Sequence, residues 1–256
     1  MTKESLQKHF KSMGARVKFR STEATRRRIP TAESFIIDIK QDKRGEYFDI
    51  LQGKAAPQLE LLQVKPKERH LLLYARDGQR FLCGYDERHW FVAGVDVPVS
   101  TVRAAKASLI PANIQERVRR LSSKDLNKRR NAAFKRQGEW FFIPVNRDVP
   151  KHLTLKDEPL QRTASSKPHI CQEIYREGGE LVYIVKGKEM TKAEYAQRKK
   201  TDPNFNPWNP QMMMRNPEVY ARGYVRHADH ATIKLDGWHR VFINAESMTS
   251  AVSFLD

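Results

Sequence analysis

Short apolar stretches separated by polar turn residues dominate residues 34–97. Asp77-Gly78 is a strong two-residue turn signal, and the polar stretch 41–46 is also suited to a turn. Each apolar stretch has the length of a strand, so we expect an antiparallel sheet of about five strands. The stretches are 35–39, 47–51, 70–74, 80–84 and 89–95.

A helical pattern replaces the strand pattern in residues 103–136. Ser100 is a suitable N-cap for a helix that ends before Pro111. Residues 122–125 resemble a capping box, which predicts a further helix up to Phe134. Between these two helices, one apolar stripe is formed at helical spacing by Ile114, Val118 and Leu121.

The last part of the chain returns to a mixed pattern. Residues 139–145 form a nearly continuous apolar strand, and residues 146–168 contain three prolines and are predicted to be a linker. Residues 231–235 and 238–243 flank Asp236-Gly237, the clearest hairpin signal in the chain. We therefore predict an α+β protein in four parts: a flexible basic arm (1–33), an antiparallel β lobe (34–102), a basic helical segment (103–136) and a mixed lobe that ends in a hairpin (137–256).

Positive charge changes this picture because it is unevenly placed. The chain has a formal net charge of +17. Residues 1–30 carry nine Lys or Arg against two acidic residues, and residues 103–136 carry eleven against two. The remaining residues are therefore close to neutral. Concentrated cationic segments are typical of proteins that bind a polyanion, above all nucleic acid.

We predict that these two segments contact phosphates and that Trp208, in an Asn- and Pro-rich loop, stacks on a base. Phe134 is a second candidate for stacking. The sequence does not distinguish DNA from RNA. The predicted nucleic-acid-binding residues are Arg26, Arg27, Arg28, Arg117, Arg119, Arg120, Lys124, Lys128, Arg129, Arg130, Lys135, Arg136 and Trp208.

One histidine-rich segment supports an alternative function. His227, Asp229 and His230 carry ligand types that zinc or manganese accepts. If the predicted hairpin forms, His230 and His239 stand about 13 Å apart along neighbouring strands and cannot share an ion. A metal site would need a further ligand from a distant histidine, such as His169 or His89, so we assign no metal and no cofactor.

Several functional classes are excluded or disfavoured by what the sequence lacks. It contains no phosphate-binding glycine motif and no nucleophile elbow. Two cysteines cannot form a disulfide framework, and we find neither a secretory signal nor an apolar run long enough to span a membrane. We therefore expect a cytoplasmic protein, associated with a nucleoid or a ribonucleoprotein.

The charge distribution favours a nucleic-acid-binding protein without catalytic residues, one that has protein partners in a nucleoprotein complex. The alternative is a metal-dependent nuclease or nucleic-acid-modifying enzyme centred on His227, Asp229 and His230. A third hypothesis is a scaffold whose basic face docks an acidic protein partner.

Overall fold

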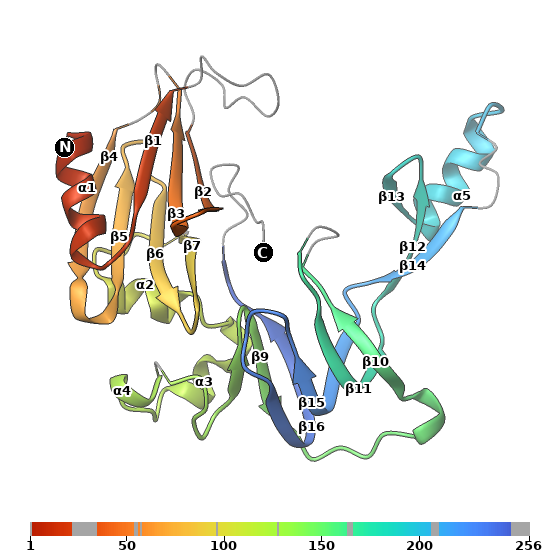
Figure 1. Ribbon diagram of the computed structural model, residues 1–256. Helices are drawn as coiled ribbons and strands as arrows, with labels where there is room; N and C mark the ends of the chain where they lie inside the picture. The colour runs from red at the N-terminus through yellow and green to blue at the C-terminus, as the bar shows by residue number, and fades with distance from the viewer. Residues whose placement is uncertain are drawn as a thin grey trace.

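The computed structural model describes residues 2–21, 35–53, 56, 58–95, 97–126, 128–162, 166–205 and 210–246 (Figure 1). It contains both helices and strands, with several antiparallel sheets, which confirms the α+β class. The longest helices in these ranges have ten residues, and none is both long and apolar enough to span a bilayer.

The N-terminal residues are folded, so the prediction of a flexible arm is wrong for residues 2–21. Helix α1 (Lys3–Ser12) begins at Thr2, whose side chain accepts a hydrogen bond from the Ser5 amide at 3.2 Å. Strand β1 (Val17–Ser21) then pairs in parallel with β3 (Gly45–Gln52), which forms the predicted hairpin with β2 (Phe35–Asp42). The apolar side of α1 holds this segment against the sheet, because Leu6 and Phe10 are buried.

A second, four-stranded sheet follows in the order β4-β5-β6-β7. Strand β5 (His70–Ala75), one of its two inner strands, carries a run of three leucines, Leu71 to Leu73, because both faces of the sheet are buried. Leu71 and Leu73 face the core shared with α1 and β3, and Leu72 packs against α2 (Val102–Ser108). The strands are β4 (Leu59–Lys65), β5 (His70–Ala75), β6 (Arg80–Asp86) and β7 (His89–Val95), and a short 3-10 helix, η2 (Pro66–Glu68), precedes β5.

The basic segment 103–136 forms only short helices after α2. These are η3 (Ala112–Ile114), α3 (Gln115–Val118) and α4 (Ser123–Leu126). The apolar stripe is confirmed, since Ile114 and Val118 are buried and Leu121 packs against them. The helix expected to reach Phe134 ends at Leu126, because apolar positions are too sparse to support it. Asn131 instead accepts hydrogen bonds from the Ala133 and Phe134 amides and holds a turn.

A six-stranded sheet in the order β10-β11-β15-β16-β9-β8 forms most of the C-terminal half. Two sequence predictions fail here. The expected linker 146–168 contains η4 (Lys151–Leu153) and the edge strand β10 (Leu155–Leu160). The expected hairpin at Asp236-Gly237 is a single strand, β16. This strand spans Ile233–Ile243. The other strands are β8 (Lys135–Gln137), β9 (Trp140–Pro144), β11 (His169–Glu177) and β15 (Glu218–Arg226).

The Asp-Gly pair serves as a bulge instead of a turn. The register between β15 and β16 steps from Ala221 opposite His239 to Gly223 opposite Leu235, so three residues of β16 face one residue of β15. Gly223 has a φ of +82°, a left-handed conformation that glycine adopts easily. Pairing of β16 with two neighbouring strands, β15 and β9, outweighs the local turn preference of Asp236-Gly237.

A three-stranded sheet in the order β13-β12-β14, together with α5, projects from the six-stranded sheet (Figure 1). Helix α5 begins with a complete capping box between Thr191 and Glu194. Tyr183 stacks on Tyr195 at 4.3 Å between ring centroids and joins the helix to the sheet. The elements are β12 (Glu180–Val185), β13 (Lys188–Thr191), α5 (Lys192–Thr201) and β14 (Gln211–Arg215).

Candidate metal centre and basic surface

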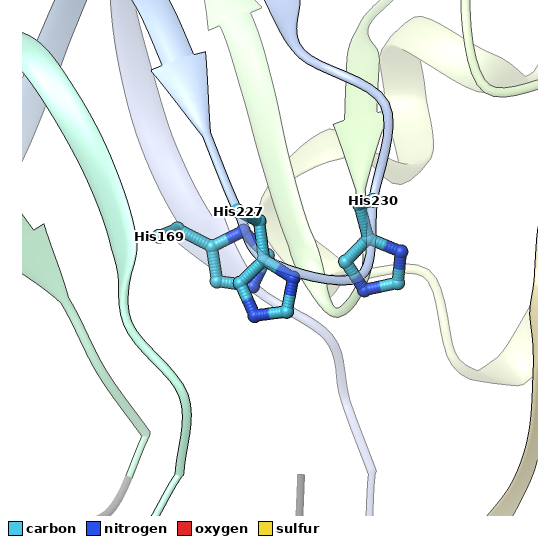
Figure 2. Close-up of side chains that lie close together, drawn as sticks. All are labelled: His169, His227 and His230. Atoms are coloured by element: carbon cyan, nitrogen blue, oxygen red, sulfur yellow. The ribbon is translucent and has the colours of Figure 1, made fainter.

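Three histidines meet at one end of the six-stranded sheet (Figure 2). His169 is the first residue of β11, His227 directly follows β15, and His230 lies in the loop before β16. Strands β11 and β15 are neighbours, which brings His169 beside His227. One ring nitrogen of each histidine lies within 4.8 Å of those of the other two. This separation is small enough for a single cation to draw the three side chains together.

Gln137 determines which nitrogen of His169 carries the proton. The Gln137 amide donates from Nε2 to the carbonyls of Val225 and Ala231, at 3.2 and 2.7 Å. Because carbonyls only accept hydrogen bonds, Oε1 of Gln137 is the atom that faces Nδ1 of His169 at 3.0 Å. Nδ1 of His169 is therefore protonated, and in the neutral ring Nε2 keeps its lone pair. This is the arrangement that residues behind a metal ligand impose.

The turn between β8 and β9 places a carboxylate beside His169. Glu139 Oε2 lies 3.5 Å from His169 Nε2. Burial raises the pKa of Glu139, but its interactions with His169 lower it by more, so the pKa lies below its usual value and the carboxyl is ionised at neutral pH. Gly138 makes this close approach possible, since a Cβ there would lie 2.9 Å from Nε2 of His230 and its φ is +56°.

The three rings are stacked and poorly hydrated. The His169 and His227 centroids are 4.1 Å apart, and those of His227 and His230 are 4.6 Å apart. Burial, followed by the neighbouring histidines, lowers the pKa of His227 to about 4 and also lowers that of His230. Both rings are therefore neutral at pH 7, the form that binds metal. Lone pairs lie in the ring planes, so a shared cation requires at least one ring to rotate out of the stack.

Asp229 orients the loop and does not join the three histidines. Its amide donates to Nδ1 of His227 at 3.1 Å, and its carboxylate pairs with Lys167 at 2.6 Å and lies 3.8 Å from His89. A cation on Nδ1 of His227 would replace the first of these hydrogen bonds. The backbone of Lys167 also hydrogen bonds the His227 ring.

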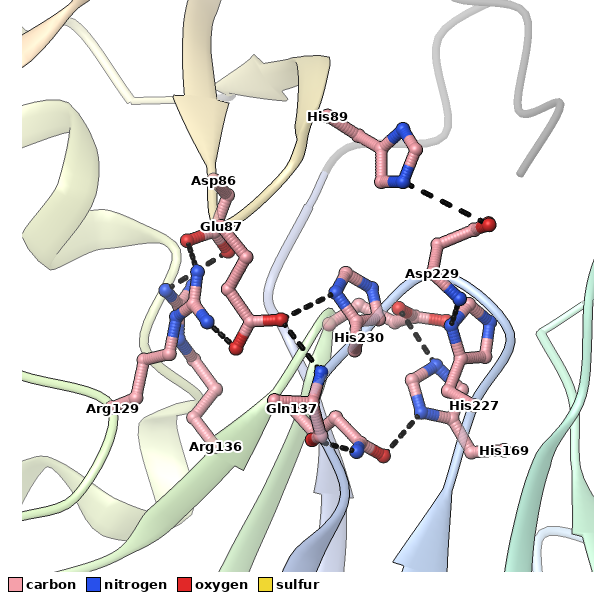
Figure 3. A network of polar contacts seen from close by, with 12 residues as sticks. Asp86, Glu87, His89, Arg129, Arg136, Gln137, His169, His227, Asp229 and His230 are labelled. Atoms are coloured by element: carbon pink, nitrogen blue, oxygen red, sulfur yellow. Dashed lines mark hydrogen bonds and ion pairs between the residues drawn. The ribbon is translucent and has the colours of Figure 1, made fainter.

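A turn from the N-terminal half closes the other side of the site (Figure 3). Glu87, between β6 and β7, accepts a hydrogen bond from the Ala231 amide at 3.0 Å, and its carboxylate lies 3.4 Å from Nδ1 of His230. Glu87 and Asp86 form ion pairs with Arg129, and Asp86 also pairs with Arg136 at 3.2 Å. The site is therefore built from both halves of the chain.

A pocket of about 450 Å³ opens between these elements. Its lining includes His227, His230 and Glu139 at one side and Arg129 and Arg136 at another. Such a volume lies within the range of about 300–1,000 Å³ that is usual for small-ligand sites. His227 and His230 therefore face a space that can hold a substrate.

His70, which also lines this pocket, makes the stability depend on pH. Burial lowers its pKa to about 4 from 6.5. Between these values the unfolded chain binds a proton that the folded protein does not, so we expect stability to fall as pH drops from 6.5 to 4, by at most roughly 3 kcal/mol from this group. Urea unfolding of metal-free protein at pH 7 and 5 measures this loss. His70→Gln should flatten the dependence and the exposed-site variant His152→Gln should not; equal slopes in all three proteins would contradict the assignment.

The residues predicted to bind nucleic acid divide into an exposed set and an inward set. Arg119 pairs with Glu116 at 3.1 Å, and Lys128 pairs with Asp125 at 2.6 Å. Lys135 contacts Asp236, and Arg129 and Arg136 line the pocket. Exposed side chains for which the described part of the chain shows no ion pair are Arg117, Arg120, Lys124 and Arg130.

Some of the predicted residues belong to neither the exposed set nor the inward set. Arg26, Arg27, Arg28 and Trp208 lie outside the described residues. Phe134, the second stacking candidate, is buried against Phe141 with 4.9 Å between ring centroids, so it belongs to the core.

Sequence reasoning placed His227 and His230 correctly in one segment but did not find Gln137 or Glu139. His169 was named only as one of two distant histidines. The hairpin on which the predicted separation of His230 and His239 rested does not form; His239 is buried within β16 and its Nδ1 lies 2.8 Å from the Gly237 carbonyl. Of His169, Gln137 and Glu139, only His169 could have been indicated by the sequence, because it begins a strand-like stretch.

Comparison with known proteins finds no relative of this chain. The chain matches no protein-family model, and no curated protein and no solved structure matches it. Its function is therefore inferred from the geometry of the site.

Proposed function

We propose that this protein is a metal-dependent hydrolytic enzyme in which His169, His227 and His230 hold one divalent cation. The observation that carries the proposal is the convergence of three histidines, two of which line a pocket, with His169 held by Gln137 in the tautomer whose Nε2 can bind metal. Imidazole ligands suit zinc, and also iron, copper and nickel. The two halves of the chain act as lobes that enclose this centre.

Three protein ligands leave a coordination position for water, as in catalytic zinc sites. Glu139, ionised and 3.5 Å from His169, is placed to accept a proton from that water. A cation held by the three histidines would lower the pKa of a bound water and so supply the nucleophile for hydrolysis of an ester. Glu139 would take the proton from that water and return it to the leaving oxygen as the ester bond breaks.

The test is metal stoichiometry. Equilibrium dialysis of the full chain against zinc, nickel, cobalt or manganese should give one bound cation per chain for at least one metal. The visible spectrum of the cobalt form would report nitrogen ligation. A variant with all three histidines replaced by Ala serves as the reference, and equal binding by both proteins would refute the proposal.

A second function, binding of DNA or RNA, is favoured by the exposed cations of the basic segment. Arg117, Arg120, Lys124 and Arg130 are free to contact phosphates, and each contact releases counterions. This binding surface and the metal centre share the segment that contains Arg129 and Arg136. In this combined picture the enzyme acts on nucleic acid.

Salt dependence tests the second function. Replacing Arg117, Arg120, Lys124 and Arg130 with Ala should reduce the slope of log affinity against log salt by up to about 3 for oligonucleotides. A matched control removes four cations from the projecting sheet and helix: Lys186, Lys188, Lys199 and Lys200. Equal slopes in the two variants, or no oligonucleotide binding by the wild type, would contradict nucleic-acid binding. Either result would favour the hypothesis that the basic surface binds an acidic protein partner.

A further inference from the structure

The pocket beside the histidines contains a group of three cationic side chains. Arg129 and Arg136 come from the basic segment, and Lys106 comes from α2. Asp86 lies between the two arginines and pairs with both. Lys106 also interacts electrostatically with Arg136 and Asp86. Three cations thus lie close to one carboxylate.

These cations retain donors for a ligand. Arg136 makes one side-chain hydrogen bond among the described residues, to Asp86 at 3.2 Å, although a guanidinium has five N–H groups. The Lys106 ammonium lies 3.4 Å from Glu68, a long contact for a charged pair. Burial lowers the pKa of Lys106, so its present surroundings stabilise the ammonium less than water does. An anion between Lys106 and Arg136 would supply the missing partner.

The charge of the whole pocket points in the same direction. The lining contains five Lys or Arg and five Asp or Glu. A divalent cation on the histidines would add two positive charges and leave the pocket with a cationic excess. A site of this kind favours a ligand with a doubly negative group, such as a phosphate monoester.

Another part of the lining is apolar. Phe91, Leu109 and Leu126 contribute to the pocket wall, and none of the three is fully buried. A flat aromatic ring of a ligand can pack on such a wall, as bases do on apolar and aromatic side chains. The pocket therefore combines a cationic group, an apolar wall and the histidine cluster in about 450 Å³.

We propose that this pocket binds a nucleotide, with its phosphate on Lys106 and Arg136 and its base against the apolar wall. The inference rests on the proposed function, because it gives the substrate class of the same site. The nucleotide is either free or the phosphorylated end of a strand. A strand end would continue along the exposed cations Arg117, Arg120, Lys124 and Arg130.

Calorimetry with metal-free protein tests this proposal separately from metal binding. The probes are AMP, adenosine and inorganic phosphate, and a hexanucleotide with and without a 5′-phosphate. We expect AMP to bind at least about tenfold more tightly than adenosine, since charge-assisted hydrogen bonds recognise its phosphate. Phosphate should compete with AMP. Tighter binding of the phosphorylated hexanucleotide than of AMP assigns the ligand to a strand end, and equal or weaker binding assigns it to a free nucleotide.

The variant Lys106→Met identifies the phosphate position. It removes the ammonium and leaves only the half-exposed Glu68 without its contact, so the fold should be retained. AMP affinity should fall between about 10- and 100-fold while adenosine affinity stays unchanged. Arg103→Met, on the exposed side of the same helix, is the matched control.

Three results would overturn the nucleotide proposal: equal affinity for AMP and adenosine, no AMP binding at millimolar concentration, or unchanged AMP binding by Lys106→Met. Metal binding is measured on the same samples. AMP binding without any metal binding would refute the hydrolytic function and keep the nucleotide site. Metal binding without AMP binding would refute the nucleotide site and keep the hydrolytic function.

Discussion

The His169→Ala variant is expected to lose at least about 100-fold in metal affinity, more than the loss of a residue behind a metal ligand usually costs. His169 is 1% exposed, and the protein holds its ring through Gln137 on one side and against Glu139 on the other. Only two of the three clustered histidines, His227 and His230, would remain in this variant. Equilibrium dialysis with the metal that binds the wild type measures this effect.

The variant Gln137→Leu tests how much the positioning of His169 contributes to metal affinity, while all three histidine ligands are kept. The leucine keeps the approximate size of the side chain but removes the acceptor for Nδ1 of His169, so the favoured tautomer is lost. We expect an intermediate loss of about 10- to 100-fold in metal affinity. His152→Ala, which removes an exposed histidine of η4, should bind like the wild type. Wild-type affinity in His169→Ala would show that the three histidines do not form the metal centre.

Phe10→Ala is expected to lower the free energy of unfolding by about 3–5 kcal/mol, the usual cost of removing a buried phenylalanine side chain. Phe10 is fully buried and packs on Phe48, with 4.9 Å between the ring centroids. The loss is large because α1 closes the core shared by the two N-terminal sheets. Urea unfolding at pH 7 measures it.

Lys8→Ala is the matched control on the same helix. Lys8 is exposed, and alanine is an excellent helix former, so the free energy of unfolding should change by less than about 0.5 kcal/mol. If Phe10→Ala were as mild as Lys8→Ala, α1 would not be part of the core and the flexible arm predicted from the sequence would describe residues 2–21 after all.

The parts of the fold that could be predicted from the sequence are those with strong local signals. The polar stretch 41–46 contains the tight connection between β2 and β3, and Asp77-Gly78 lies in the connection between β5 and β6, as expected. Asp236-Gly237 has the same local signal but lies inside β16, because pairing with two neighbours decides the outcome. The N-terminal segment was predicted to be a flexible arm because the buried residues of α1, Leu6 and Phe10, are few among many charges.

The candidate site could be predicted only in part, because it depends on which strands become neighbours. His227 and His230 are close in sequence and were found together. His169 joins them only because β11 pairs with β15, a choice that no local pattern reveals. Gln137 and Glu139 lie on either side of an ordinary glycine turn, and their roles follow from distances to His169.

The contact between Glu87 and the Ala231 amide joins residues 144 positions apart in the chain. Closing so long a loop is slow compared with pairing neighbouring strands, so we expect this contact to form late in folding. The three histidines, which all belong to the C-terminal half of the chain, would then come together earlier, while the site is still open to solvent. A cation could therefore enter during biosynthesis, before the Asp86–Glu87 turn covers it, and its later exchange would be limited by local opening of that turn.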